Sequence, residues 1–154
     1  MEENHQIDNL DRKILDLLQL DGRMAYTEIA KKLTISHGTV HQLMARLEEL
    51  GIIKGTSIII DYQKIGYDVT TLLGIHLKSA KDQAKVIDRL KAMKEVVEVY
   101  YTTGAFALII KVHNKNIKDF HHFLSDKLQG IPEIQSTESF VCLDHPLSRT
   151  LKIT

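Results

Sequence analysis

The amino-acid sequence predicts an α+β fold with two small domains, an N-terminal winged helix-turn-helix and a C-terminal ferredoxin-like βαββαβ sandwich. The first 50 residues repeat apolar side chains every three or four positions, as amphipathic helices do. Beyond residue 68, segments rich in β-branched residues alternate with helical segments in the order strand, helix, strand, strand, helix, strand. A chain of 154 residues can form two such domains, each with a small core.

The N-terminal half is expected to contain three helices. They span about Asn9–Leu20, about Tyr26–Leu33, and the residues between Ser36 and Gly51. Asp8 and Ser36 can accept hydrogen bonds from the unpaired N–H groups at a helix start, so they cap the first and third helices. Asp21-Gly22 is expected to end the first helix with a left-handed glycine, and Gly51 to end the third.

The segment from Ile52 to Ile60 marks the end of the first domain. It is rich in β-branched residues and is interrupted by Gly55, which predicts a small wing followed by a connecting strand. Residues 61–66 are expected to form a loop. We therefore predict a first domain over residues 1–60, a linker over 61–66 and a second domain over 67–154.

The second domain is predicted to consist of two βαβ halves in succession. Its expected strands and helices are, in order, about Val69–Leu77, Lys81–Met93, Val96–Thr103, Ala105–His113, Ile117–Gln129 and Glu133–Leu143. Thr103-Gly104 forms the tight connection between the two middle strands. Gly130-Ile131-Pro132 ends the last helix before the final strand.

The apolar pattern of two strands predicts self-association of the second domain. Both crossover helices of this fold cover one face of the sheet, so the strands should alternate apolar and polar side chains. Instead, Ala105–Ile110 is continuously apolar, and apolar residues such as Leu72 and Leu73 populate both faces of the first strand. Since the eleven residues after Leu143 offer little cover, we predict a dimer formed through the open sheet faces.

Composition excludes several classes of protein. Lys and Arg number 20, as do Asp and Glu, which argues against a polyelectrolyte binder. Cys142 is the single cysteine, so no disulfide within the chain can form, and a reducing cytoplasm is expected. No apolar run approaches the length of a membrane span.

Catalysis, a cofactor and a metal site are not expected. The sequence has no phosphate loop, zinc signature or nucleophile elbow. Cys142 and His145 could form a thiol and base, but no residue is evident that would orient the histidine. His121 and His122 are neighbours on a helix and point in different directions, which disfavours a shared metal ion.

The third helix carries side chains suited to reading double-stranded DNA. In a winged helix-turn-helix this helix enters the major groove. Gln42 can pair with adenine and Arg46 with guanine or phosphate, while Gly38 permits a close approach. The candidate DNA-binding residues are Lys32, Ser36, His37, Gly38, Thr39, His41, Gln42 and Arg46. The alternative is a protein-interaction module whose polar helix face is merely solvated.

Several motifs resemble the Lrp/AsnC, or feast/famine, family of regulators. Ile7–Leu15, Asp21–Arg23, Ser36–Val40 and Leu47–Gly55 resemble the family's DNA-binding half. Tyr100–Gly104 and Glu133–Glu138 resemble its asparagine-responsive members, so the resemblance covers essentially the whole chain. It implies a transcriptional regulator whose C-terminal domain binds a small amino acid, with asparagine as the expected effector, and assembles into dimers and then octamers. Where many relatives carry an Asp after the mid-sheet glycine, this chain has Ala105-Phe106-Ala107.

An amino-acid effector needs donors for its carboxylate, acceptors for its ammonium and, for asparagine, both for its amide. The candidate effector-binding residues are Tyr100, Tyr101, Thr102, Thr103, Gly104, Gln135, Ser136, Thr137 and Glu138. Strand alternation places Gln135 and Thr137 on one face and Ser136 and Glu138 on the other, so we expect a pocket between subunits or at a strand edge. The alternative function is decarboxylation of a sirohaem-type tetrapyrrole, because such enzymes resemble this family in fold and length.

Overall fold

The computed structural model describes residues 7–154; residues 1–6, with which the predicted first domain begins, lie outside the described residues. The chain forms two compact units. The first contains the residues up to Ile59 together with Leu147–Thr154, and the second contains Ile60–Pro146. The predicted second domain runs to Thr154, whereas the last eight residues pack with the first unit. None of the helices within residues 7–154 combines the length and the apolar character that a membrane span requires.

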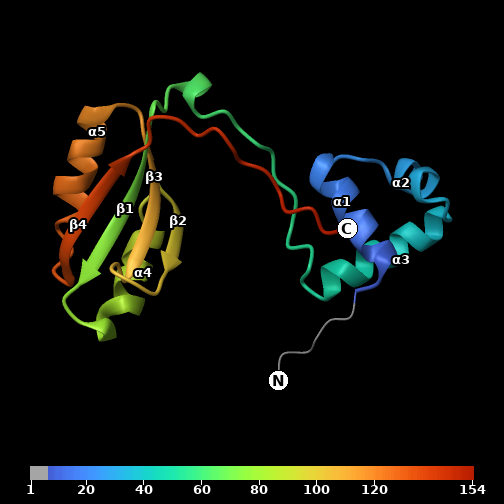
Figure 1. Cartoon of the computed structure of the whole chain (residues 1–154), viewed down its shortest axis with the longest axis horizontal. Coiled ribbons are helices and arrows are strands. Elements are labelled where there is room, and N and C mark those ends of the chain that lie inside the picture. The colour runs from blue at the N-terminus through green and yellow to red at the C-terminus, as the bar shows by residue number, and fades with distance from the viewer. Residues whose placement is uncertain (1–6) are drawn as a thin grey trace. The chain divides into compact units, whose positions relative to one another are not determined.

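The first unit holds three helices, α1 (Asn9–Leu20), α2 (Tyr26–Leu33) and α3 (His37–Glu49) (Figure 1). Asp8 caps α1 through a reciprocal capping box with Asp11, and Ser36 caps α3, as predicted. The core beneath the helices consists of Ile14, Leu15, Ile29, Ala30, Val40, Met44 and Leu47, all buried. Gly51 follows α3 with a φ of 70°, which confirms its predicted role.

Two predictions for this unit are wrong. Gly22 is not left-handed; α1 ends at Asp21 in an extended conformation, and a Cβ on Gly22 would lie 2.9 Å from Cγ2 of Thr56. Close packing, and not backbone conformation, is therefore what suits glycine there. Residues 52–60 also contain no strand. A strand requires a hydrogen-bonded neighbour, and no other segment of residues 7–154 pairs with this one.

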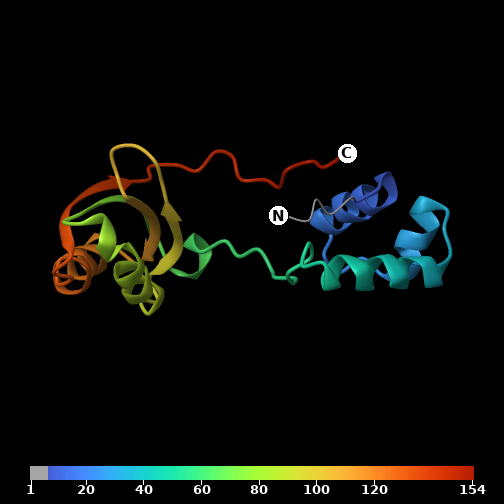
Figure 2. The same cartoon turned by 90° about the horizontal axis from the view of Figure 1, so that it is seen from below.

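The second unit has the predicted ferredoxin-like topology. Its elements are β1 (Val69–Leu77), α4 (Gln83–Lys91), β2 (Val96–Tyr101), β3 (Leu108–Asn114), α5 (Ile117–His122) and β4 (Ile134–Val141). The strands form one antiparallel sheet in the order β2-β3-β1-β4. Both helices cover the same face of the sheet (Figure 2), where Leu73, Ile75, Val86, Leu90 and Ile110 are fully buried in the core.

Several element boundaries differ from the predicted ones. A 3₁₀ turn, Ala80–Asp82, precedes α4, and a π-helical turn, Phe123–Leu128, continues α5. The strand predicted from Ala105 begins only at Leu108. The cause is a turn over Thr102–Ala107, in which Thr102 donates from its amide to the carbonyl of Ala107 and from its hydroxyl to the carbonyl of Phe106.

Candidate nucleic-acid interface and ligand pocket

A tight turn joins α2 to α3 and sets the direction of the third helix. Thr34 ends α2 with a φ of 55°, and the amide of Ile35 donates to the carbonyl of Ala30 over 3.0 Å. At the start of α3, Ser36 Oγ accepts from the amide of Thr39 over 3.1 Å, and the two hydroxyl oxygens lie 2.7 Å apart. The helix start is therefore held by the same two residues that were predicted to contact phosphate.

The predicted reading residues of α3 lie on one side of the helix. Val40, Met44 and Leu47 are buried against α1 and α2 on the other side. The residues exposed on this side are His37, Gly38, His41, Gln42, Ala45 and Arg46, and Thr39 is half-buried. A Cβ on Gly38 would meet only Ser36 Oγ, at 3.9 Å, so this glycine leaves open space at the start of α3. Such a polar, uncovered helix face is suited to a DNA groove.

Tyr26 joins this face, although no local sequence pattern indicates it. Its ring lies edge-on to that of His41, with centroids 4.6 Å apart, and His41 packs in the same way on His37 at 4.5 Å. Tyr26 is half-buried at the first position of α2. The cluster holds the two imidazoles against the protein, because aromatic rings favour edge-to-face contact.

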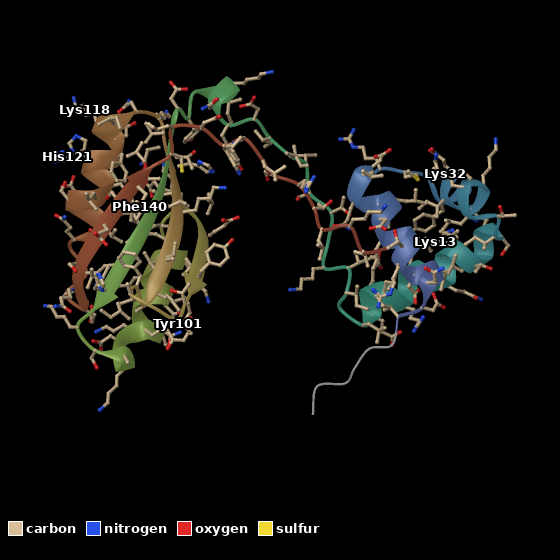
Figure 3. All side chains as sticks on the ribbon, viewed as in Figure 1. Lys13, Lys32, Tyr101, Lys118, His121 and Phe140 are labelled. Atoms are coloured by element: carbon tan, nitrogen blue, oxygen red, sulfur yellow. The ribbon has the colours of Figure 1, made fainter. Side chains whose placement is uncertain are left out.

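Two of the predicted DNA-binding cations have partners within the unit. Arg46 Nη1 lies 3.0 Å from Asp11 Oδ2, and the Asp11 side chain has no exposed surface. Lys32 pairs with Glu28 on the same helix, at 3.8 Å, and both side chains are about half exposed (Figure 3 labels Lys32). Arg46 thus neutralises a buried carboxylate, whereas the exposed Lys32 pair is weak and readily exchanged.

The second unit contains a hollow of about 300 Å³ beside the Thr102–Ala107 turn. Its lining comes from the end of β1, the start of α4, the end of β2 and the turn: His76, Leu77, Ala80, Gln83, Tyr101, Thr102, Gly104, Ala105, Phe106 and Ala107. Gly104 has a φ of 103°, and no atom lies within 4 Å of where its Cβ would be. The turn therefore leaves its backbone accessible beside the hollow.

The predicted effector residues separate into two groups. Tyr101, Thr102 and Gly104 line the hollow, whereas Tyr100, Thr103, Gln135, Ser136, Thr137 and Glu138 do not. Tyr101 lies at the end of β2 (Figure 3), and Ser136 is paired in register with His76 of the lining. Tyr100 and Glu138 belong to one cross-strand row on the helix-free face, Tyr100–Ile109–Gly74–Glu138.

Phe106 connects the hollow to that row. Its ring packs over Gly74, where a Cβ would come within 2.5 Å of ring atoms, and lies 4.9 Å from the His76 ring. His76, Gln83 and Phe106 are not among the predicted site residues, because they come from three separate segments. The apolar run Ala105–Ala107 is the local signal for this position, but its pattern is also typical of a strand.

The polar groups around the hollow suit a small polar ligand. Gln83 offers an amide with both donor and acceptor atoms, and His76 offers an imidazole. Nearby on the sheet, the Tyr100 hydroxyl donates to Glu98 over 3.1 Å, which raises the pKa of Tyr100 above its ordinary value. Tyr100 is therefore neutral at physiological pH. Within residues 7–154, no group of three or more His, Cys, Asp or Glu residues could hold a metal ion.

Comparison with known proteins shows that the helix-turn-helix and the unit with the hollow each match a known domain. Residues 7–54 match a winged helix-turn-helix DNA-binding domain, and residues 70–151 match the Lrp/AsnC ligand-binding domain. The regulatory protein AsnC of Haemophilus influenzae is 48% identical over 96% of this chain and 99% of its own, and that of Escherichia coli K12 is 45% identical over 97% and 99%.

Solved structures agree with these matches. The structure of E. coli AsnC superposes with a TM-score of 0.91 at 43% identity, covering 96% of this chain and 99% of that one. A Neisseria meningitidis regulator, NMB0573, crystallised with L-Met, shares the fold with a TM-score of 0.89 at 20% identity, over 94% of this chain and 95% of that one.

A helix-turn-helix unit joined to a small-molecule-binding sandwich defines a ligand-responsive transcriptional regulator, and the names of the relatives agree. This chain belongs to the Lrp/AsnC family. The relatives are named as regulatory proteins, so the chain is a DNA-binding regulator and not an enzyme, and the tetrapyrrole decarboxylase alternative is rejected.

Proposed function

We propose that this regulator senses asparagine in the hollow beside the Thr102–Ala107 turn and that α3 reads its operator DNA. The observation that carries the proposal is the hollow itself, which combines an accessible turn backbone at Gly104 with the side chains of Gln83 and His76. Backbone N–H groups of the turn can bind the ligand carboxylate, and Gln83 can pair with the ligand amide through one donor and one acceptor.

Glu138 and Tyr100 complete the site in this proposal. Both lie on the helix-free face, in the row that passes under Phe106, and both are exposed. Glu138 can accept from the ammonium of an amino acid that is bound where two sheets face each other. Aspartate would place a second carboxylate near Glu138, and like-charge repulsion would weaken its binding.

The helix-free face of the sheet also favours self-association. Leu72 is 40% exposed and Phe140 is 54% exposed, and the two are register partners on that face. A second copy covering these side chains would remove apolar surface from water. We propose a homodimer formed through this face, assembling further into octamers, in a protein that acts in the cytoplasm.

Assembly gives the regulator its affinity for DNA in this proposal. The chain has no net charge, so overall electrostatic attraction to DNA contributes little to its affinity. Two α3 helices that bind the same DNA together must supply the rest of that affinity. Asparagine then alters DNA binding by binding one assembly more tightly than another, which shifts the population between them. On α3, Gln42 is the residue proposed to pair with adenine, while Ser36, Thr39 and the helix start contact phosphate.

Titration calorimetry with asparagine, aspartate, glutamine and leucine tests the effector assignment. Asparagine is expected to bind most tightly, and Gln83→Ala should weaken it at least tenfold. Gln129→Ala is the matched control, because Gln129 is exposed in the same unit and lies outside the hollow. Equal affinity for aspartate and asparagine would contradict the assignment.

Footprinting upstream of the chain's own gene, with and without asparagine, tests the DNA assignment. Gln42→Ala is expected to relax base preference at one position by about 1–3 kcal/mol, the usual contribution of a bidentate contact. Gln63→Ala, at an exposed glutamine of the second unit, should leave base preference unchanged. Unaltered base preference in the Gln42 variant would remove this residue from the reading face.

A further inference from the structure

The last residues of the chain form hydrogen bonds with α1 of the DNA-binding unit. Asp16, on α1, accepts at Oδ1 from the amide of Ile153 over 2.8 Å and at Oδ2 from the amide of Thr154 over 3.0 Å; the Thr154 hydroxyl also donates to Oδ2. One turn along, Gln19 Nε2 donates to the carbonyl of Leu151 over 3.0 Å. Figures 1 and 2 both place the C-terminus beside α1.

An apolar side chain accompanies these hydrogen bonds. Ile153 is half-buried and packs against the core that α1, α2 and α3 share. Its neighbours do not, since Leu151 is 82% exposed and Leu147 is 61% exposed. The tail therefore contacts the unit specifically, through one isoleucine and its backbone groups, and not through nonspecific burial of all its apolar side chains.

The tail changes how the DNA-binding unit is connected to the rest of the chain. The chain leaves the unit after Ile59 and returns to it at Leu147, so two covalent connections join the two units. A unit held by one connection samples more orientations than a unit held by two, and each additional constraint removes conformational entropy. Where two reading helices must bind DNA together, this restriction raises the effective concentration of the second helix.

We propose that residues 147–154 are a structural part of the DNA-binding unit and act as a second tether that its DNA affinity requires. The docking partner is the chain's own α1, through Asp16 and Gln19. The tether is separate from the effector hollow, because no tail residue lines it. Its loss should therefore weaken DNA binding and leave asparagine binding unchanged.

Two matched alanine substitutions in the full-length chain test the docking. Ile153→Ala is expected to lower the melting midpoint of the DNA-binding unit by about 4–8 °C, the shift that corresponds to a loss of about 1 kcal/mol in a domain of this size. Leu151→Ala is the matched control, because it removes an equally large aliphatic side chain two residues away and keeps the backbone acceptor of Gln19. Equal shifts for the two variants would contradict specific docking.

Hydrogen exchange gives a readout that does not depend on overall stability. The amides of Ile153 and Thr154 are expected to be protected in the wild-type chain and to lose protection in Asp16→Asn, because the neutral amide has a single acceptor oxygen for three donors. Protection that survives in Asp16→Asn would overturn the contact.

Deleting residues 147–154 separates docking from tethering. The deletion is expected to lower both the melting midpoint and the affinity for operator DNA, at least fivefold for the latter. A synthetic peptide of residues 147–154 added in trans should restore the midpoint and leave DNA affinity low, because it docks without connecting the units. Full recovery of DNA affinity with the peptide would overturn the tether, as would a deletion that binds DNA like the wild-type chain.

Mixed assemblies decide which chain supplies the tail. When ¹⁵N-labelled deleted chains are mixed with unlabelled full-length chains, the labelled α1 amides should keep the resonance positions of the undocked state. A shift of these resonances to the docked positions would mean that the tail crosses to a second copy, and would refute docking on the chain's own α1.

Discussion

Replacing Arg46 by methionine should destabilise the DNA-binding unit more than it alters base reading. The side chain of Asp11 is fully buried, its Oδ2 accepts from the amide of Asp8 and from Arg46, and its Oδ1 has no hydrogen-bond partner among residues 7–154. Methionine keeps the aliphatic stem of Arg46 and removes the cation, so the buried carboxylate of Asp11 loses the guanidinium that pairs with its Oδ2.

The magnitude follows from the burial of the two groups. Breaking a fully buried ion pair costs about 3–5 kcal/mol, whereas an exposed pair contributes about 0–1 kcal/mol. Arg46 keeps 44% of its side chain exposed while Asp11 keeps none, so an intermediate loss of about 2 kcal/mol is expected. In a unit of this size, that loss corresponds to a fall of about 10 °C in the melting midpoint.

Thermal and urea unfolding of Arg46→Met, followed by a probe in the first unit, measures this loss. Lys13→Met is the control, because it removes an exposed cation from α1 (Figure 3). Adding Asp11→Asn to Arg46→Met should recover part of the stability, since a neutral amide needs no cation. Wild-type stability together with a large loss of operator affinity would refute the structural role and favour Arg46 as a base-reading residue.

Three further predictions concern the pocket wall, the tail and the reading face. Gly74→Ala places a Cβ within 2.5 Å of the Phe106 ring, so the ring must move. Calorimetry should detect a loss of asparagine affinity of about tenfold. An unchanged affinity would show that Phe106 does not belong to the effector site. The hydrogen bond from the Thr154 side chain lowers the pKa of Asp16, as do those from the Ile153 and Thr154 amides and the charge of Lys152. The tail contact is therefore complete above the unfolded pKa of about 4 and is lost as the pH falls from there through the lower pKa of the folded chain. Hydrogen exchange should record this loss in the wild-type chain and none in Asp16→Asn. Tyr26→Phe should keep operator affinity while Tyr26→Leu lowers it, because the ring and not the hydroxyl contacts His41; equal affinities in both variants would contradict a positioning role.

Local features of the fold could be predicted from the sequence because they depend on neighbours along the chain. The three helices of the first unit, the caps at Asp8 and Ser36 and the order of the sheet elements follow from apolar period and capping residues. The wing did not form within residues 52–60 for a related reason. Strand propensity depends on the local sequence, but a strand forms only when it pairs with a neighbouring strand. Which segment becomes that neighbour depends on the tertiary structure.

The candidate sites divide in the same way. The exposed face of α3 could be predicted, since one helix with a regular period places Gln42 opposite Val40 and Met44. The hollow could be predicted only at its turn, through Thr102 and Gly104. Its other walls come from β1 and α4, and no spacing along the sequence relates Gln83 to Phe106.

By itself, the sequence determined the type of each domain and the helix that faces DNA, because periodicity, caps and turn residues act over a few positions. Only the tertiary structure decided that Arg46 neutralises the buried Asp11, that Phe106 closes over Gly74, and that Thr154 docks on Asp16. These contacts join residues that are far apart in the chain. Their energies depend on desolvation and on direct approach, which exist only once the chain has folded.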